Sequence, residues 1–152
     1  MGEVVRQEFE TFVHDVEPSL RRALVAAFGF ERGRDATAEA LRWAWENWER
    51  AKDLNNKIAY LFRVGQSKSR DRKTPDIFER SEAHEPWYDP GLAPALSALT
   101  ENQRVAVVLI NGFEWKLREV AELLGVGVST VQSHLERGMR ALRNALEVVE
   151  ND

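Results

Sequence analysis

The segment from residue 117 to residue 146 constrains the fold most, because it carries two apolar stripes at helical spacing with a glycine between them. The first stripe consists of Leu117, Val120, Ala121 and Leu124. Gly125 is expected to end that helix. The second stripe consists of Val128, Val131, Leu135, Met139, Leu142 and Leu146. Two helices joined by a tight glycine-containing turn predict a helix-turn-helix.

The rest of the sequence also favours helices, since no stretch shows the alternation that marks a strand. Apolar residues repeat at helical spacing over residues 5–28, and Pro18 is expected to divide this stretch into two helices. Gly29 and Gly33 are expected to stop the second of them. The fold class predicted is therefore all-α.

A third helix is predicted from Asp35, a good N-cap residue, to about residue 50. Its apolar stripe, expected to be buried, consists of Leu41, Ala44, Trp45 and Trp48. A fourth helix is predicted near residues 58–73. Thr100 and Gln103 stand at capping-box spacing and predict the start of a further helix.

Residues 74–93 interrupt the helical pattern with prolines and hold five acidic residues against one arginine. We interpret this stretch as an acidic linker between two small helical domains, one over residues 1–73 and one over residues 94–152. Each domain is small enough that its core is marginal. We therefore expect the two domains to rearrange relative to one another when a partner binds.

Composition argues against several classes of protein. The chain has no cysteine and its three histidines lie far apart, so neither a metal site nor a cofactor is expected. No apolar run approaches the roughly 20 residues that span a bilayer, and the first residues lack the apolar core of a signal peptide. We therefore expect a cytoplasmic protein. The sequence offers no nucleophile–base pair or phosphate-binding loop, so an enzyme is not expected.

The net charge of −4 is distributed unevenly along the chain. Residues 1–73 carry a net charge of +2, whereas residues 94–152 carry −2. Within the first part, residues 57–73 hold six basic residues and one acid. This basic segment is either part of a nucleic-acid surface or an ordinary solvated helix face.

The second helix of the predicted helix-turn-helix has a polar outer face. Its residues are Ser129, Gln132, Ser133, Glu136, Arg137 and Arg140. Such side chains can hydrogen-bond to base edges and phosphates in the major groove, and Arg137 is the best candidate for a bidentate guanine contact. A helical hairpin that binds protein is the alternative interpretation.

Residues 99–142 carry a pattern made of Gln103, Arg104, Glu119, Val120, Ala121, Leu123, Leu124, Gly125, Thr130, Val131, Ser133, Leu135, Arg137 and Gly138. In this pattern the segment resembles region 4 of the sigma-70 family of bacterial transcription initiation factors. Residues 35–45 and 60–71 are similar to region 2 of the same family. The residues that match there are Asp35, Glu39, Ala44, Trp45, Leu61, Arg63, Val64 and Asp71. With no region 3 between the two, the chain resembles the small extracytoplasmic-function class.

The resemblance implies core RNA polymerase and promoter DNA as partners, with an anti-sigma factor as a further candidate. It implies that the minus-35 element is read by Lys116, Ser129, Gln132, Ser133, Glu136, Arg137 and Arg140. For the opened minus-10 strand it implies Asn55, Asn56, Lys57, Arg63, Lys68, Arg70, Arg72 and Lys73. It further implies that core RNA polymerase is bound by Asp35, Glu39, Arg42 and Trp43. The acidic linker would run through polymerase channels that otherwise hold nucleic acid.

The sequence departs from the family pattern at Ala36, Thr37 and Ala38, in the motif that binds the polymerase clamp. Gln132 and His134 stand where the family often has lysine or arginine, which leaves fewer phosphate contacts. These departures keep one alternative open, a sigma-like decoy that binds an anti-sigma factor without initiating transcription.

Overall fold

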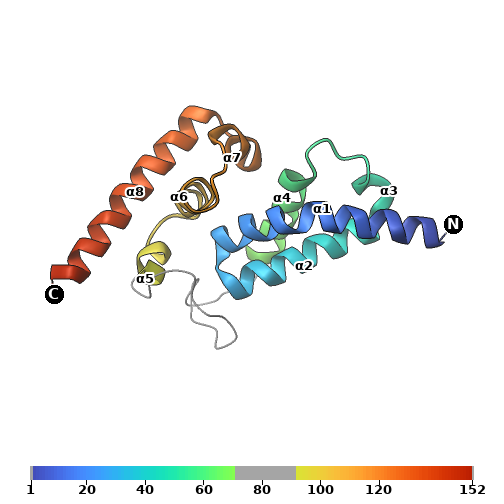
Figure 1. The fold of residues 1–152 in the computed structure, drawn as a ribbon, viewed down its shortest axis with the longest axis horizontal. Helices are drawn as coiled ribbons and strands as arrows, with labels where there is room; N and C mark the ends of the chain where they lie inside the picture. The colour runs from blue at the N-terminus through green and yellow to red at the C-terminus, as the bar shows by residue number, and fades with distance from the viewer. Residues whose placement is uncertain (1, 71–91, 152) are drawn as a thin grey trace.

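The computed structural model describes residues 2–70 and 92–151, and every regular element in these residues is a helix. The N-terminal half comprises α1 (Gly2–Phe28), α2 (Phe30–Glu46), α3 (Trp48–Ala51) and α4 (Lys57–Arg70). The C-terminal half comprises α5 (Leu92–Ser97), α6 (Glu101–Val107), the π-helix η1 (Val108–Gly112), α7 (Leu117–Leu124) and α8 (Val128–Asn151). The halves lie side by side, with the chain ends at opposite ends of the molecule (Figure 1). The predicted all-α class is confirmed.

Helix α1 runs through Pro18 without a break, so the predicted division into two helices is wrong. Proline removes one backbone donor from a helix interior and costs roughly 3 kcal/mol there. The buried residues of α1 nevertheless keep one helical period on both sides of it, from Phe12 and Val16 to Leu20 and Leu24. Burial of this continuous face against the rest of the molecule outweighs the local cost.

The junction between α1 and α2 depends on two glycines that have different roles. Gly29 has φ 87°, a left-handed conformation that favours glycine, and it ends α1 as predicted. Gly33 lies inside α2, so its predicted role as a helix stop is wrong. A Cβ atom at Gly33 would come within 2.5 Å of the Val25 Cα atom, so this glycine allows α1 and α2 to approach closely. Because α2 already begins at Phe30, the predicted start at Asp35 is also wrong.

The face of α2 that packs inward consists of small residues. It is formed by Gly33, Ala36, Thr37, Ala40 and Ala44. Trp45 lies beside this face and is 47% exposed, so its predicted burial is wrong. Its ring contacts Phe9 at a centroid distance of 4.9 Å. Trp48, in α3, is buried as predicted and meets Phe12 edge-to-face at 5.2 Å.

Helix α4 packs on α1 through Leu61, Phe62 and Gly65, which are buried. A Cβ atom at Gly65 would lie 2.8 Å from a methyl carbon of Leu24, so the two helices are in close contact. The Asn56 side-chain oxygen accepts a hydrogen bond from the Ala59 N–H at 3.0 Å and thereby caps the start of α4.

The C-terminal half follows the sequence prediction closely. Thr100 and Gln103 form the predicted capping box at the start of α6. Gly125 ends α7 in a left-handed conformation with φ 70°, so the predicted turn of the helix-turn-helix is confirmed. Val128 is the one member of the α8 stripe whose predicted burial is wrong. It is the first residue of α8 and is 41% exposed, so the buried stripe begins one turn later at Val131.

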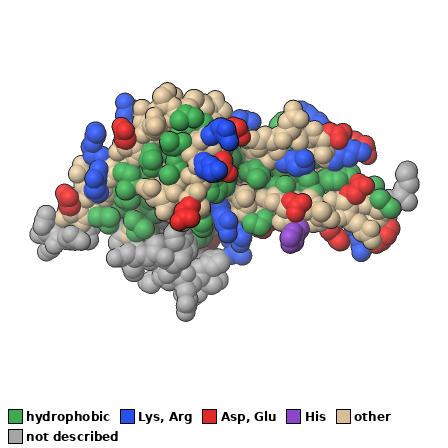
Figure 2. Space-filling view, turned by 45° about the horizontal axis from the view of Figure 1, so that its top comes forward, with side chains coloured by type: hydrophobic (Ala, Val, Ile, Leu, Met, Phe, Trp, Pro, Cys, Tyr) green, Lys and Arg blue, Asp and Glu red, His purple; other side chains and the backbone are tan. Residues whose placement is uncertain are grey.

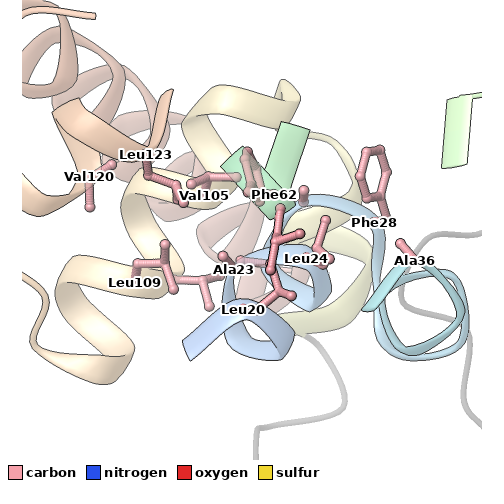
Figure 3. Close-up of a cluster of buried hydrophobic side chains, with 14 of the residues drawn as sticks. Leu20, Ala23, Leu24, Phe28, Ala36, Phe62, Val105, Leu109, Val120 and Leu123 are labelled. Carbon is pink, nitrogen blue, oxygen red and sulfur yellow. The ribbon is translucent and has the colours of Figure 1, made fainter. Parts of the chain in front are cut away.

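A single apolar cluster joins the two halves (Figure 3). Leu20, Ala23 and Leu24 of α1 belong to it, as do Val105 of α6 and Leu109 of η1. Because α1 contacts both α4 and α6, each half completes its core against the other.

The predicted linker over residues 74–93 lies outside the described residues, apart from Leu92 and Ala93. These two residues form the first turn of α5. Within the described parts of the chain, no helix is both long enough and apolar enough to span a membrane.

Candidate nucleic-acid interface

Helix α8 buries one face and presents the other to solvent. Val131 is fully buried, and a Cβ atom at Gly138 would lie 2.7 Å from a Val107 methyl, so α8 packs closely on α6. All six polar residues predicted for the outer face are exposed, namely Ser129, Gln132, Ser133, Glu136, Arg137 and Arg140. The structure thus brings these side chains together on one exposed helix surface. A surface of this kind has the shape and the donors that reading base edges requires.

Lys116 is exposed at the start of α7, the first helix of the helix-turn-helix. Its backbone N–H donates to the Glu119 carboxylate at 3.0 Å, which is one half of a capping box. The other half is missing because a lysine side chain has no acceptor for the free N–H groups of the first turn. The α7 N-terminus therefore carries a cation where a capping oxygen would usually stand.

The basic face of α4 borders a groove of about 680 Å³. The groove is lined by Glu39, Trp43, Tyr60, Arg63, Val64, Ser67 and Lys68. The rings of Trp43 and Tyr60 lie 5.3 Å apart, and the Arg50 guanidinium lies 5.8 Å and 5.5 Å from their respective centroids. Aromatic rings beside basic side chains are what a single-stranded nucleic acid needs for stacking and phosphate contact. Sequence reasoning missed Arg50 and Tyr60, whose apposition depends on the packing of α3 near α2 and α4.

The loop before α4 holds the remaining candidates of this part of the chain. Asn55 and Asn56 are both exposed, although the Asn56 side chain is already engaged as a helix cap. The Lys57 ammonium donates to the Leu54 carbonyl at 3.2 Å and so steadies the loop. Asn55 is thus the asparagine better placed to meet a ligand.

The far end of α4 faces the C-terminal half. Arg70 lies 3.6 Å from the Glu101 carboxylate, and the Gln66 amide donates to the same carboxylate at 2.9 Å. Arg72 and Lys73, also predicted as DNA contacts, lie outside the described residues. Figure 2 shows basic and acidic side chains interleaved over the visible face, so the molecule does not present a uniformly basic surface there. The described residues contain no group of three or more side chains suited to hold a metal ion.

Residues 92–142 match the family model of sigma-70 region 4. This match covers the helix-turn-helix whose geometry is described above. A solved structure with a similar fold is the sigma factor RpoE in complex with the anti-sigma factor NepR from Bartonella quintana. The likeness has a TM-score of 0.67 at 20% sequence identity, and it covers 93% of this chain and 98% of that chain.

The resemblance of the C-terminal half to sigma-70 region 4, inferred from the sequence, is therefore confirmed. The likeness to RpoE extends over both halves and shows that the fold of the chain is like that of this sigma factor. Below, region 4 denotes α5–α8, which contain the matched residues, and region 2 denotes α1–α4, after the part of the family that they resemble in sequence.

The region 2 residues predicted to bind polymerase lie along α2. Asp35 and Arg42 are exposed, whereas Glu39 and Trp43 are half-buried. The Arg42 guanidinium pairs with Glu46 one turn later at 3.1 Å. Glu39 and Trp43 also line the groove of α4, so the predicted polymerase and minus-10 surfaces adjoin each other.

The contact that Arg104 makes between the two regions was not predicted from the sequence. Arg104 of region 4 is only 3% exposed, and it donates to the Leu99 carbonyl and to the Ala27 carbonyl, each at 2.6 Å. Ala27 lies in the last turn of α1, which carries no basic residue of its own, so Arg104 caps a region 2 helix from region 4. Burial lowers the pKa of the Arg104 guanidinium from its usual value. The sequence singled out Arg104 only as a family match, because its partner is 77 positions away.

Proposed function

We propose that this chain directs core RNA polymerase to promoters and enables transcription initiation there. One observation carries the proposal. A single chain that matches sigma-70 region 4 presents an exposed polar helix suited to duplex DNA together with a basic, aromatic groove suited to a single strand. Initiation needs both, because the minus-35 element is read as a duplex and the minus-10 element as an opened strand.

The minus-35 role is assigned to the outer face of α8. Arg137 and Arg140 are exposed on it, with Gln132 and Ser133 one turn earlier. An arginine that reaches a guanine from the major groove discriminates by about 1–3 kcal/mol against the wrong base. Lys116 at the adjacent N-terminus of α7 would add a phosphate contact.

The minus-10 role is assigned to the groove between α2 and α4. Arg63 and Lys68 would contact phosphates, while Trp43 and Tyr60 offer ring faces to unstacked bases. Asn55, exposed in the loop before α4, would hold a flipped base at one end of the path.

The remaining partners follow from the same assignment. Core polymerase would bind α2 through Asp35, Glu39 and Arg42, of which Glu39 also lines the edge of the groove. The RpoE structure with a similar fold is a complex with an anti-sigma factor, and we propose a protein of that class as a regulator of this chain. Both partners place the protein in the cytoplasm, and the proposed role requires no catalytic chemistry of its own.

A reconstituted transcription assay tests the proposed function. The purified chain is mixed with core RNA polymerase and genomic DNA fragments, and the transcripts are sequenced to map their starts. We expect discrete starts that share upstream elements and that disappear when Arg137 and Lys68 are both changed to alanine. A chain that comigrates with core polymerase but yields no transcript would contradict the proposal and support the decoy alternative.

A further inference from the structure

Region 4 carries little positive charge for a part of the chain assigned to duplex DNA. Residues 94–152 hold six basic and eight acidic residues. One of the six, Arg104, is buried between the two regions and donates to backbone carbonyls there, so it does not reach DNA. Non-specific affinity for duplex DNA comes mainly from contacts between cations and phosphates. A further cation beside the helix-turn-helix would therefore strengthen binding.

Arg22 of α1 lies against the segment that leads into the helix-turn-helix. Its guanidinium carbon stands over the Phe113 ring, 5.0 Å from the ring centroid. Arg22 is exposed, and Phe113, which directly follows η1, is 37% exposed. Contact with an aromatic face orients a guanidinium and leaves its N–H groups available to an acceptor. The pair is thus an ordered cation at the surface where α1 meets region 4.

This pair is close to Lys116, the cation proposed to contact a phosphate at the start of α7. Phe113 and Lys116 are three residues apart, so the distance between their Cα atoms is at most about 11 Å. Each DNA strand carries one phosphate per roughly 3.4 Å of the duplex axis, so a surface of this length spans about three phosphates. Arg22 and Lys116 are therefore spaced to contact different phosphates of one backbone.

The nearby carboxylates leave both cations available. Within the described parts of the chain, neither Arg22 nor Lys116 forms an ion pair. The neighbouring Arg21, by contrast, pairs with Glu17 at 3.1 Å. The Glu119 carboxylate accepts from the backbone N–H of Lys116 and not from its ammonium group. A phosphate would therefore not have to displace a carboxylate from either cation.

We propose that α1 extends the duplex-binding surface of region 4, with Arg22 as a phosphate contact beside Lys116. The inference rests on the proposed minus-35 role of region 4. Arg22 would contribute affinity but no base preference, since phosphates carry no direct sequence information. A residue of region 2 would thus make up for part of the positive charge that region 4 lacks.

A pair of matched charge variants tests the contact. Arg22→Gln is compared with Arg6→Gln, which removes an equal charge near the N-terminus, at the end of α1 that lies away from region 4 (Figure 1). Affinity for a mixed-sequence duplex is measured by fluorescence anisotropy at several salt concentrations. Arg22→Gln should lower the salt slope by about one unit and weaken binding about threefold to tenfold at about 50 mM salt. Arg6→Gln should keep the slope of the parent. Equal slopes for the two variants would overturn the proposal.

Phe113→Leu separates a phosphate contact from a structural role of Arg22 in holding the two regions together. It removes the ring beneath the guanidinium but no charge. If Arg22 contacts a phosphate directly, this variant should keep the salt slope of the parent. A slope lowered as far as in Arg22→Gln would mean that Arg22 acts only through the packing of the regions, and the proposal would be wrong.

A photochemical cross-link gives direct evidence of contact, because the chain has no cysteine of its own. Arg22→Cys and Arg6→Cys are each modified with a thiol-reactive aryl azide and irradiated with the same mixed-sequence duplex. The protein labelled at position 22 should form a covalent protein–DNA adduct, and the protein labelled at position 6 should not. Equal adduct yields from the two positions would contradict a contact at Arg22.

A last variant separates this inference from the proposed function. Arg137→Ala/Arg140→Ala removes two cations from the outer face of α8, and duplex affinity is measured again. If affinity does not fall, α8 is not the duplex-binding surface, and the minus-35 assignment and its extension to α1 are both wrong. If affinity falls but Arg22→Gln behaves as Arg6→Gln does, the assignment of α8 stands and only the extension to α1 is wrong.

Discussion

The outer face of α8 and the basic face of α4 are both proposed DNA-binding surfaces, yet their side chains stand in different surroundings. Arg137 and Arg140 project into solvent from a helix whose other side is buried. On α4, Arg63 and Arg70 already have partners from region 4. As the proposed duplex-binding surface, the first is already exposed, whereas the second, as the proposed single-strand surface, would have to exchange protein contacts for DNA contacts.

The largest effect is expected where the two regions are joined. Arg104→Met should lower the free energy of unfolding by about 2–4 kcal/mol, because two carbonyl groups lose a charged donor in a buried site. Relief of the buried charge offsets part of that loss. Urea denaturation measures the change, and Arg118→Met, at an exposed position of α7, is the control. A loss as small as that of the control would mean that the regions are not coupled through Arg104.

The two surfaces should also respond differently to loss of one cation. Arg137→Ala is expected to cost about 1–3 kcal/mol on the preferred promoter and to relax base preference at one position. Lys68→Ala should instead weaken binding on all sequences and lower the salt slope by about one unit. Affinities on matched and mismatched sites at several salt concentrations test both. If both variants lose the same affinity on every DNA sequence, Arg137 contacts only phosphates, and the two surfaces do not differ in how they recognise DNA.

The sequence predicted region 4 better than the packing of α1 and α2. Gly125 and the Thr100 capping box are local signals, since a left-handed residue and a helix cap involve only near neighbours in sequence. The errors at Pro18 and Gly33 arose where packing between helices overrides such signals. By its local sequence, Gly33 resembles a residue that ends a helix. Its actual role is to let Val25 of α1 approach closely, and no local sequence pattern predicts this contact between two helices.

The candidate sites divide in the same way. The outer face of α8 follows from helical periodicity and was predicted in full. The groove beside α4 combines residues of α2 and α4, and the pair Trp43–Tyr60 was therefore not predicted. The carboxylates that contact α4 come from region 4, so only the packing of the two regions identifies them.

A smaller effect is expected from substitution of Glu114, a residue of region 4 that belongs to neither proposed DNA-binding surface. Glu114 has φ 61° in the short connection between η1 and α7, a conformation unfavourable for residues other than glycine. Glu114→Gly should therefore raise the free energy of unfolding by about 1 kcal/mol. Glu114→Ala removes the same charge but keeps the strain, so it should change stability little. If the alanine variant gains as much as the glycine variant, the gain is electrostatic and not conformational.

The smallest effect is expected at Lys116, where stability and DNA affinity oppose each other. Lysine provides no acceptor at this helix start, and its charge opposes the positive end of the α7 dipole. Lys116→Thr completes the capping box with Glu119 and should stabilise the protein by about 0.5–1 kcal/mol. The same change removes a cation from a helix N-terminus suited to a phosphate, so duplex affinity should fall at low salt and converge with the parent at high salt.

Gly127→Ser is the matched control for the opposition between stability and DNA affinity at Lys116, because it alters the start of the next helix without changing the charge. Gly127 precedes α8 and has open space around the position of a Cβ atom. Since glycine is already a tolerable cap, serine should add only a few tenths of a kcal/mol and leave the salt dependence of binding unchanged. Melting temperature and duplex affinity at two salt concentrations are measured for both variants. A Lys116→Thr protein that melts no higher than the parent, or binds duplex as tightly at low salt, would show that Lys116 does not exchange local stability for phosphate affinity.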